Sequence, residues 1–198
     1  MSPPPSGPAR AQSRFYGKYR GVVIDNIDPA QIGRIQAQVP DVLGEVPSSW
    51  ALPCASAAGL QAGCFIVPPT GSQVWIEFEQ GDRDYPIWTG GFWGLAADVP
   101  ALAISPPPIP PGQNIVLQTT SQNTLALSDA SPSPTGGGII LKAAGGAMIV
   151  VNDAGVIISN GRGATITLLG PAVSINSGAL SVTGAMVSVD GAPLTTGP

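Results

Sequence analysis

The stretch Val173–Pro193 reads VSINSGALSVTGAMVSVDGAP and divides into three lines of seven residues, VSINSGA, LSVTGAM and VSVDGAP. Each line opens with an apolar residue, a serine and a second apolar residue. This period of two places both large side chains on one face of a strand. A glycine follows in each line and allows a sharp turn, because it adopts positive φ without a Cβ clash. The stretch therefore predicts a short strand and a turn repeated three times, which is typical of stacked architectures.

Apolar residues two positions apart also recur upstream, at looser spacing and with glycine-rich turns between them. The upstream pairs are Ile115/Leu117, Leu125/Leu127, Ile139/Leu141, Met148/Val150, Val156/Ile158 and Ile166/Leu168. A single short strand cannot bury its apolar side or pair both of its backbone edges, so we expect these strands to be stable only when stacked. The predicted core of the stack includes Ile166, Leu168, Val173, Ile175, Leu180, Val182, Val187 and Val189.

Composition divides the 198-residue chain into two parts. Charged residues make up only 10% of it, and every aromatic residue lies between Phe15 and Trp93. The part after Pro111 is nearly uncharged and rich in Gly, Ala, Val and Ser. We therefore predict a disordered N-terminal tail at residues 1–14, a domain at 15–94, a proline-rich linker at 95–113 and a stacked β domain at 114–198.

The aromatic part predicts a small closed barrel. Short strands separated by turn signals are expected at residues 19–26, 33–39, 50–55, 73–79 and 85–90, and no helical period is present. In the alternating segment Gln73–Glu79, we expect Val74, Ile76 and Phe78 to point into the barrel. Trp75, Glu77 and Glu79 are then expected to share the other strand face and to point outward or into an interface.

Several classes of function are disfavoured by composition. The formal net charge of −4 argues against a phosphate-binding surface. The chain has no histidine, which removes the usual general base and imidazole ligation of zinc, so we predict no catalytic residue, no metal and no cofactor. The N-terminus lacks the apolar core of a secretory signal, and without one we expect Cys54 and Cys64 to be buried free thiols rather than a disulfide.

Two residue clusters leave alternatives open. The acidic residues Glu77, Glu79, Asp82 and Asp84 suit either a carboxylate pair or calcium site, or a solvated strand face and turn, and the second reading is favoured. A second cluster of aromatic side chains suits packing against a hub protein or a sister chain, or the stacking of bases. Few basic residues are nearby, so packing is favoured. This cluster comprises Trp75, Trp88, Phe92 and Trp93.

Six short elements in the first part occur in the order of a known family. They are GVV at 21–23, Asp28-Pro29 with Gly33-Arg34, Pro68-Pro69 before Gly71, VWIEFE at 74–79, Gly81-Asp82, and PIWTG at 86–90. The segment that contains them resembles the N-terminal OB-fold of baseplate central-spike proteins. These proteins occur in contractile phage tails and related injection systems, including the valine-glycine repeat proteins of type VI secretion.

The resemblance implies an all-β chain with an N-terminal OB-fold barrel followed by a C-terminal intertwined trimeric β-helix, a triangular prism. Three chains would each supply one strand per layer, so that the strands above and below belong to other chains. The function implied is that of a structural, non-enzymatic central spike located in the baseplate and assembled in the cytoplasm without a signal peptide.

The implied partners are two further copies of the chain, a baseplate hub protein, transiently the target membrane, and a proline-alanine-alanine-arginine (PAAR) repeat protein as a tip; no nucleic acid is expected. The expected tip contacts are Pro193, Leu194, Thr195 and Thr196. One alternative is an OB-fold module that binds an oligonucleotide or glycan on a β-helical stalk. Another is a polysaccharide-degrading enzyme that uses Glu77.

Overall fold

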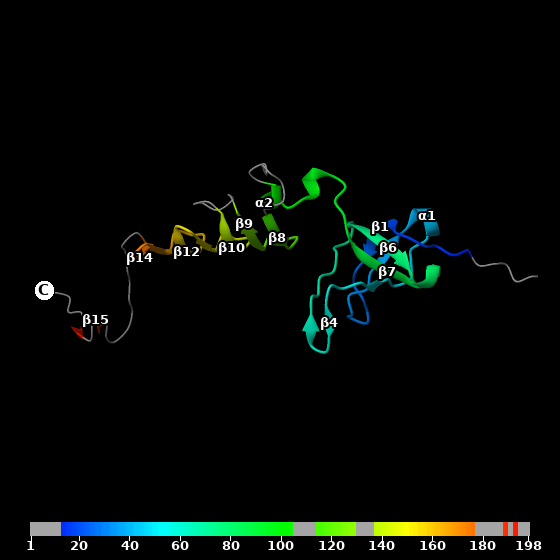
Figure 1. The fold of residues 1–198 in the computed structure, drawn as a ribbon, viewed down its shortest axis with the longest axis horizontal. Helices are drawn as coiled ribbons and strands as arrows, with labels where there is room; N and C mark the ends of the chain where they lie inside the picture. The colour runs from blue at the N-terminus through cyan, green and yellow to red at the C-terminus, as the bar shows by residue number, and fades with distance from the viewer. Residues whose placement is uncertain (1–12, 105–113, 130–136, 177–187, 190–191, 194–198) are drawn as a thin grey trace, which may run out of the picture. The chain divides into compact units, whose positions relative to one another are not determined.

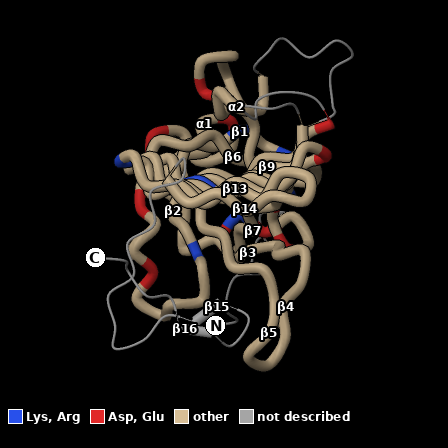
Figure 2. Tube along the Cα trace, turned by 90° about the vertical axis from the view of Figure 1, so that its left-hand side faces the viewer, with Lys and Arg blue, Asp and Glu red and all other residues tan. Residues whose placement is uncertain are grey.

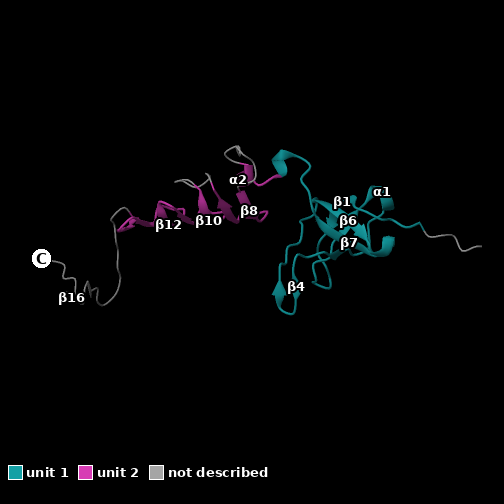
Figure 3. Cartoon of the chain, in the orientation of Figure 1, with its two compact units in different colours: residues 1–98 teal, residues 99–198 magenta. Residues whose placement is uncertain are grey.

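The structure is a computed structural model that describes residues 13–104, 114–129, 137–176, 188–189 and 192–193 (Figure 1). The chain forms two compact units, residues 1–98 and residues 99–198 (Figure 3). Nearly all of the predicted N-terminal tail lies outside the described residues. The same holds for Leu180, Val182 and Val187, and for the side chain of Val189.

The first unit is built on a five-stranded sheet in the order β2-β1-β6-β7-β3. Its strands are β1 (Tyr19–Asp25), β2 (Gln36–Gln38), β3 (Leu52–Pro53), β6 (Gln73–Phe78) and β7 (Pro86–Gly91). A further backbone bridge joins Ile35 to Ala51, directly before β2 and β3. Because β2 and β3 are the two ends of the strand order, this bridge brings the sheet edges together and closes the barrel.

The barrel core contains the residues that the alternating pattern predicts. Val74 and Ile76 are fully buried, Phe78 is 6% exposed, and the residues between them are half-buried. Phe15 and Tyr19 extend the core at one end, with ring centroids 6.2 Å and 5.7 Å from that of Phe78. The predicted inward-facing set on β6 is therefore confirmed.

Some local elements in the first unit and directly after it were not predicted from the sequence. A short helix α1 (Pro40–Leu43) follows β2, and its first residue is a proline, whose fixed φ suits the first turn of a helix. A small hairpin, β4 (Ala58–Gly59) with β5 (Ala62–Gly63), follows β3. The segment expected as a linker contains η2 (Ala96–Asp98) and α2 (Ala101–Ile104).

Strand β6 ends earlier than predicted. It stops at Phe78, and Glu79 begins the short 3-10 helix η1 (Glu79–Gly81). Glu77 and Glu79 therefore do not share one strand face, contrary to the prediction. The physical reason is the backbone of Gln80, which adopts a positive φ of 51° and turns the chain.

The second unit is a seven-stranded sheet in which each strand pairs antiparallel with the next one along the chain. Its strands are β8 (Asn114–Gln118), β9 (Thr124–Ser128), β10 (Gly138–Lys142), β11 (Met148–Asn152), β12 (Gly155–Ser159), β13 (Thr165–Leu169) and β14 (Ala172–Ile175). We call this unit the needle sheet. A separate two-stranded ladder pairs β15 (Ser188–Val189) with β16 (Ala192–Pro193).

The strand pairing in the needle sheet differs in one respect from the prediction. We expected the strands above and below to come from other chains, whereas the neighbours of β8–β14 in the sheet come from the same chain. The connections explain this difference. Residues 119–123, 143–147 and 160–164 form loops of equal length, and residues 153–154 and 170–171 form tight turns. Such short connections return the chain beside the strand it has just left.

Candidate functional site

One face of the needle sheet carries only leucine, isoleucine and valine. The register of the strands aligns these side chains in two rows from β8 to β14. We call this surface the aliphatic face. It consists of Ile115, Leu117, Leu125, Leu127, Ile139, Leu141, Ile149, Val151, Val156, Ile158, Ile166, Leu168, Val173 and Ile175.

Much of the aliphatic face is open to solvent in the single chain. Val173 is 68% exposed, Ile115 is 63% exposed, and even Ile166 on the interior strand β13 is 37% exposed. Large continuous apolar surfaces on soluble proteins mark sites of interaction. Of the eight predicted core residues, Ile166, Leu168, Val173 and Ile175 lie on this face.

The pairing register corrects one predicted pair. We expected Met148 and Val150 to continue the apolar stripe, but Ile149 lies opposite Leu141 and Val151 lies opposite Ile139. Met148 and Val150 therefore point to the other face of the sheet. A shift of one residue moves every side chain of a strand to the opposite face, and the run of apolar residues at 148–151 leaves both assignments open from sequence alone.

The opposite face changes character along the sheet. On β9–β11 its middle row is Ala126, Ile140 and Val150, which are at most 4% exposed. On β13 and β14 the same row continues with Thr167 and Ser174, which are paired in the register. The middle row of this face is therefore polar at the β14 end of the sheet, and the β8 end has a small core of its own.

Contacts between successive loops fix the stacking along one edge of the needle sheet. The side-chain oxygen of Asn123 in the first loop accepts a bond from the backbone N–H of Ala144 in the second, at 3.0 Å. Gly161 in the third loop packs so closely that a Cβ there would lie 2.5 Å from the backbone carbon of Gly146. These contacts hold the three loops in one column.

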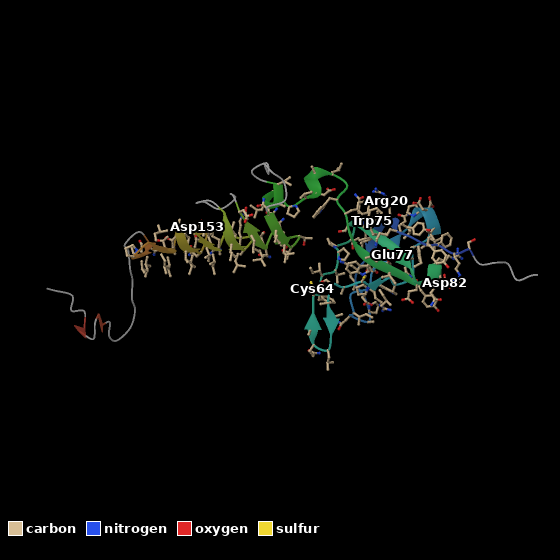
Figure 4. All side chains as sticks on the ribbon, viewed as in Figure 1. Arg20, Cys64, Trp75, Glu77, Asp82 and Asp153 are labelled. Carbon is tan, nitrogen blue, oxygen red and sulfur yellow. The ribbon has the colours of Figure 1, made fainter. Side chains whose placement is uncertain are left out.

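Three of the four aromatic residues predicted to pack against partners lie at the barrel surface. The guanidinium carbon of Arg20 lies 5.2 Å from the ring centroid of Trp75 and 4.8 Å from that of Phe92, and the two rings are 4.7 Å apart (Figure 4). Trp93 is 63% exposed. Trp88 differs, because its Nε1 donates a hydrogen bond to the carbonyl of Gly33 at 3.0 Å and its ring packs on the barrel core.

The Asp28-Pro29 and Gly33-Arg34 elements of the sequence form one network around the carboxylate of Asp28. The carboxylate of Asp28 accepts hydrogen bonds from the Arg34 guanidinium at 2.7 Å and 3.0 Å, and from the backbone N–H groups of Ala30, Ile32 and Arg34. Chiefly because of the Arg34 side chain, the pKa of Asp28 is held well below its usual range. The side chain of Asp28 is 4% exposed, so this ion pair shapes the loop between β1 and β2.

The remaining candidate groups form no chemical centre. Glu77 forms an ion pair with Lys18 at 2.7 Å, and Asp82 lies 3.7 Å from Arg14. In the part of the chain that the structure describes, no group of three His, Cys, Asp or Glu side chains is placed to hold a metal ion. Most of the chain is neutral, as the trace coloured by charge shows (Figure 2).

The two cysteines are free thiols, but our prediction that they are buried is wrong. Cys54 and Cys64 are both exposed. Cys64 directly follows β5 of the β4–β5 hairpin, whose strand residues are themselves exposed (Figure 4). Cys54 directly follows β3, where its backbone N–H donates a hydrogen bond to the carbonyl of Trp88 at 2.9 Å.

Two family models match the chain. Residues 19–93 match the Type VI secretion system/phage-baseplate injector OB domain, and residues 114–181 match the phage baseplate V C-terminal trimerisation domain. The chain belongs to the phage baseplate V family. The predicted OB-fold barrel is confirmed, and the whole aliphatic face lies within the trimerisation domain of this baseplate V protein.

Membership of the phage baseplate V family establishes a structural role in a baseplate spike and a location in the baseplate. A comparison with curated proteins finds no match. Among the described residues, no helix is both long enough and apolar enough to cross a membrane.

Proposed function

We propose that this protein is the homotrimeric, non-enzymatic central spike of a contractile phage tail or injection system. Three needle sheets come together with their aliphatic faces toward one axis. The observation that carries this proposal is the solvent exposure of the aliphatic face within the residues that match the trimerisation domain. Burial of this face is the main driving force for assembly, because removing apolar surface from water is favourable.

The proposed prism suits a mechanical role. With strands about 4.8 Å apart, the seven strands from β8 to β14 extend about 30 Å across the sheet. In the prism this direction follows the axis, so the ladder hydrogen bonds also run along the axis and share a load applied at one end. The needle carries few charges, which keeps the cost of desolvation low as it pierces a target envelope.

The surface aromatic residues of the barrel are proposed as the contact with the baseplate hub. Arg20 stacked on Trp75 and Phe92, with Trp93 exposed, offers aromatic and arginine side chains, the types that dominate protein interfaces. We leave Trp88 out of this contact, because its hydrogen bond to Gly33 gives it a role within the barrel.

A PAAR-repeat protein is proposed to cap the far end of the needle. Its expected contacts are Pro193, at the end of β16, together with Leu194, Thr195 and Thr196, which lie outside the described residues. We propose that the trimer assembles in the cytoplasm before it joins the baseplate.

The alternative functions are less well supported. Base stacking by an OB-fold needs open ring faces, whereas the Arg20 guanidinium lies over both Trp75 and Phe92. A glycosidase would need a pair of carboxyl groups free to act, whereas Glu77 is already paired with Lys18.

The stoichiometry of purified tail particles tests the proposal. We expect quantitative mass spectrometry to find three copies of this chain per particle. A Leu168→Asp variant is expected to be absent from the particles, because it places a charge on the aliphatic face. A Thr167→Asp variant serves as the control, since it changes the adjacent residue on the opposite face and is expected to be incorporated. Particles that lack the wild-type chain, or that hold a number of copies other than three, would contradict the proposal.

A further inference from the structure

The charged residues of the needle sheet are sorted by edge. Lys142 is the last residue of β10 and Arg162 lies in the loop between β12 and β13, so both stand at the edge that carries the loops 119–123, 143–147 and 160–164. We call this the loop edge. Asp129 directly follows β9 and Asp153 lies in the turn between β11 and β12, so both stand at the opposite edge, which we call the turn edge.

These four charges have no partner within the described part of their own sheet. All four residues are exposed, and none of them forms an ion pair with another described residue of the chain. The two edges are separated by the length of a five-residue strand, about 17 Å. The cations of one edge therefore cannot reach the anions of the other within one sheet.

We propose that neighbouring chains join loop edge to turn edge, with Arg162 paired to Asp153 and Lys142 paired to Asp129 of the next chain. This inference rests on the homotrimer proposed above. When three sheets are related by a threefold axis, each corner of the prism joins two different edges, because the contact is heterologous. Each corner therefore brings the cationic edge of one chain to the anionic edge of another.

The positions of the charges along the sheet match this arrangement. On the loop edge, Lys142 at the end of β10 and Arg162 between β12 and β13 are about two and a half strand spacings apart, or about 12 Å. On the turn edge, Asp129 after β9 and Asp153 between β11 and β12 are about the same distance apart. Arg162 then lies level with Asp153, and Lys142 with Asp129, when adjoining edges are displaced along the axis by one strand spacing, about 4.8 Å. A small tilt of the strands relative to the axis gives this displacement.

The proposed ion pairs determine which edges of neighbouring chains meet, and they add little to the affinity of the chains for one another. Exposed ion pairs contribute little to stability. An arrangement of the chains that brings like charges together is disfavoured, because the charges repel each other. If two sheets met loop edge to loop edge, Lys142 and Arg162 would face other cations, so the charge pattern disfavours that packing.

Crosslinking between introduced cysteines tests the proposal. The exposed native thiols are first removed by Cys54→Ser and Cys64→Ser in the full-length chain. Arg162→Cys and Asp153→Cys are then added together, and the protein is treated with a short bifunctional maleimide. We expect a covalent trimer on a denaturing gel, in at least tenfold greater yield than for either single-cysteine variant. A Lys142→Cys and Arg162→Cys pair, with both thiols on the loop edge, is the matched control and is expected to give no link between chains.

The outcomes separate this inference from the proposed function. If the cysteine-free protein has the native mass of a trimer but the Arg162/Asp153 pair does not crosslink, the edge pairing is wrong and the trimer stands. If the cysteine-free protein is a monomer, both the edge pairing and the proposed homotrimer are wrong.

A charge swap gives an independent test that does not depend on the cysteine variants. Arg162→Asp alone is expected to lower the fraction of trimer at low ionic strength, and adding Asp153→Arg is expected to restore it. A swap that restores nothing would also overturn the edge pairing.

Discussion

Leu168→Asp is expected to dissociate the trimer, whereas Thr167→Asp in the same strand is not. The two residues are adjacent, so they point to opposite faces of β13: Leu168 lies on the aliphatic face and Thr167 on the opposite one. In a trimer, three copies of Leu168 approach one axis. The substitution therefore places three carboxylates in an apolar interior, where each must lose its water or take up a proton.

The size of the effect follows from the exposure of Leu168. Leu168 is 39% exposed in the single chain. Complete burial of a leucine contributes about 1.5–3 kcal/mol, so burial of the exposed part contributes about 1 kcal/mol per chain. Desolvation of the carboxylate adds a few kcal/mol per chain. The three substitutions together cost about 10 kcal/mol, which lowers the association constant by about seven orders of magnitude.

Sedimentation equilibrium of the two variants over a range of concentrations measures this effect. We expect the Thr167→Asp protein to remain trimeric and the Leu168→Asp protein to be monomeric. Lowering the pH below the usual pKa of aspartate, about 3.9, should partly restore association of the Leu168→Asp protein, because a protonated carboxyl costs less to bury. A Leu168→Asp protein as trimeric as its Thr167→Asp control would refute the assignment of the aliphatic face to the interior.

Three further substitutions test the barrel and the turns. Asp28→Asn should lower the thermal midpoint of the barrel at pH 7, because the lowered pKa of Asp28 stabilises the fold above the unfolded pKa of about 4. Circular dichroism should show this difference shrinking as the pH falls below 4, and a difference independent of pH would contradict the role of the Arg34 pair. Trp88→Phe should destabilise the barrel by about 1 kcal/mol in urea unfolding, since the carbonyl of Gly33 loses its donor, and no change would argue against that bond. Gly155→Ala should reduce the yield of folded trimer, because a Cβ would run into a carbonyl of the next strand; a normal yield would show that the hairpin tolerates a shift.

The sequence predicts the barrel well because its strands are amphipathic. In Gln73–Phe78 the residues Val74, Ile76 and Phe78 form one wholly apolar face, whereas the other face carries the polar Gln73 and Glu77, and the structure buries the first face. The hairpin between Ala58 and Gly63 was missed because its strand residues, alanine and glycine, carry no apolar period. The exposure of Cys64, directly after β5, could not be inferred either, since it depends on how far the hairpin stands from the core.

In the needle sheet, the positions of the strands were predictable from the sequence, but which side chains lie on which face was less so. Ile166 and Leu168 are separated by Thr167 and fall on the expected face, and Val156 and Ile158 fall on it too, although the residue between them is Ile157. The run Met148–Val151 is apolar throughout, and only the pairing of Ile149 with Leu141 decides which residues join the aliphatic face. The edge charges were not recognised, because which edge a residue occupies depends on the direction of each strand in the sheet.

The native mass of the full-length protein tests the central claim most directly. If the aliphatic faces of three chains close around one axis, native mass spectrometry at micromolar concentration will give three times the 19.9 kDa of a single chain. A folded species of 19.9 kDa would contradict the account, because the aliphatic face would then be stable in water without a partner.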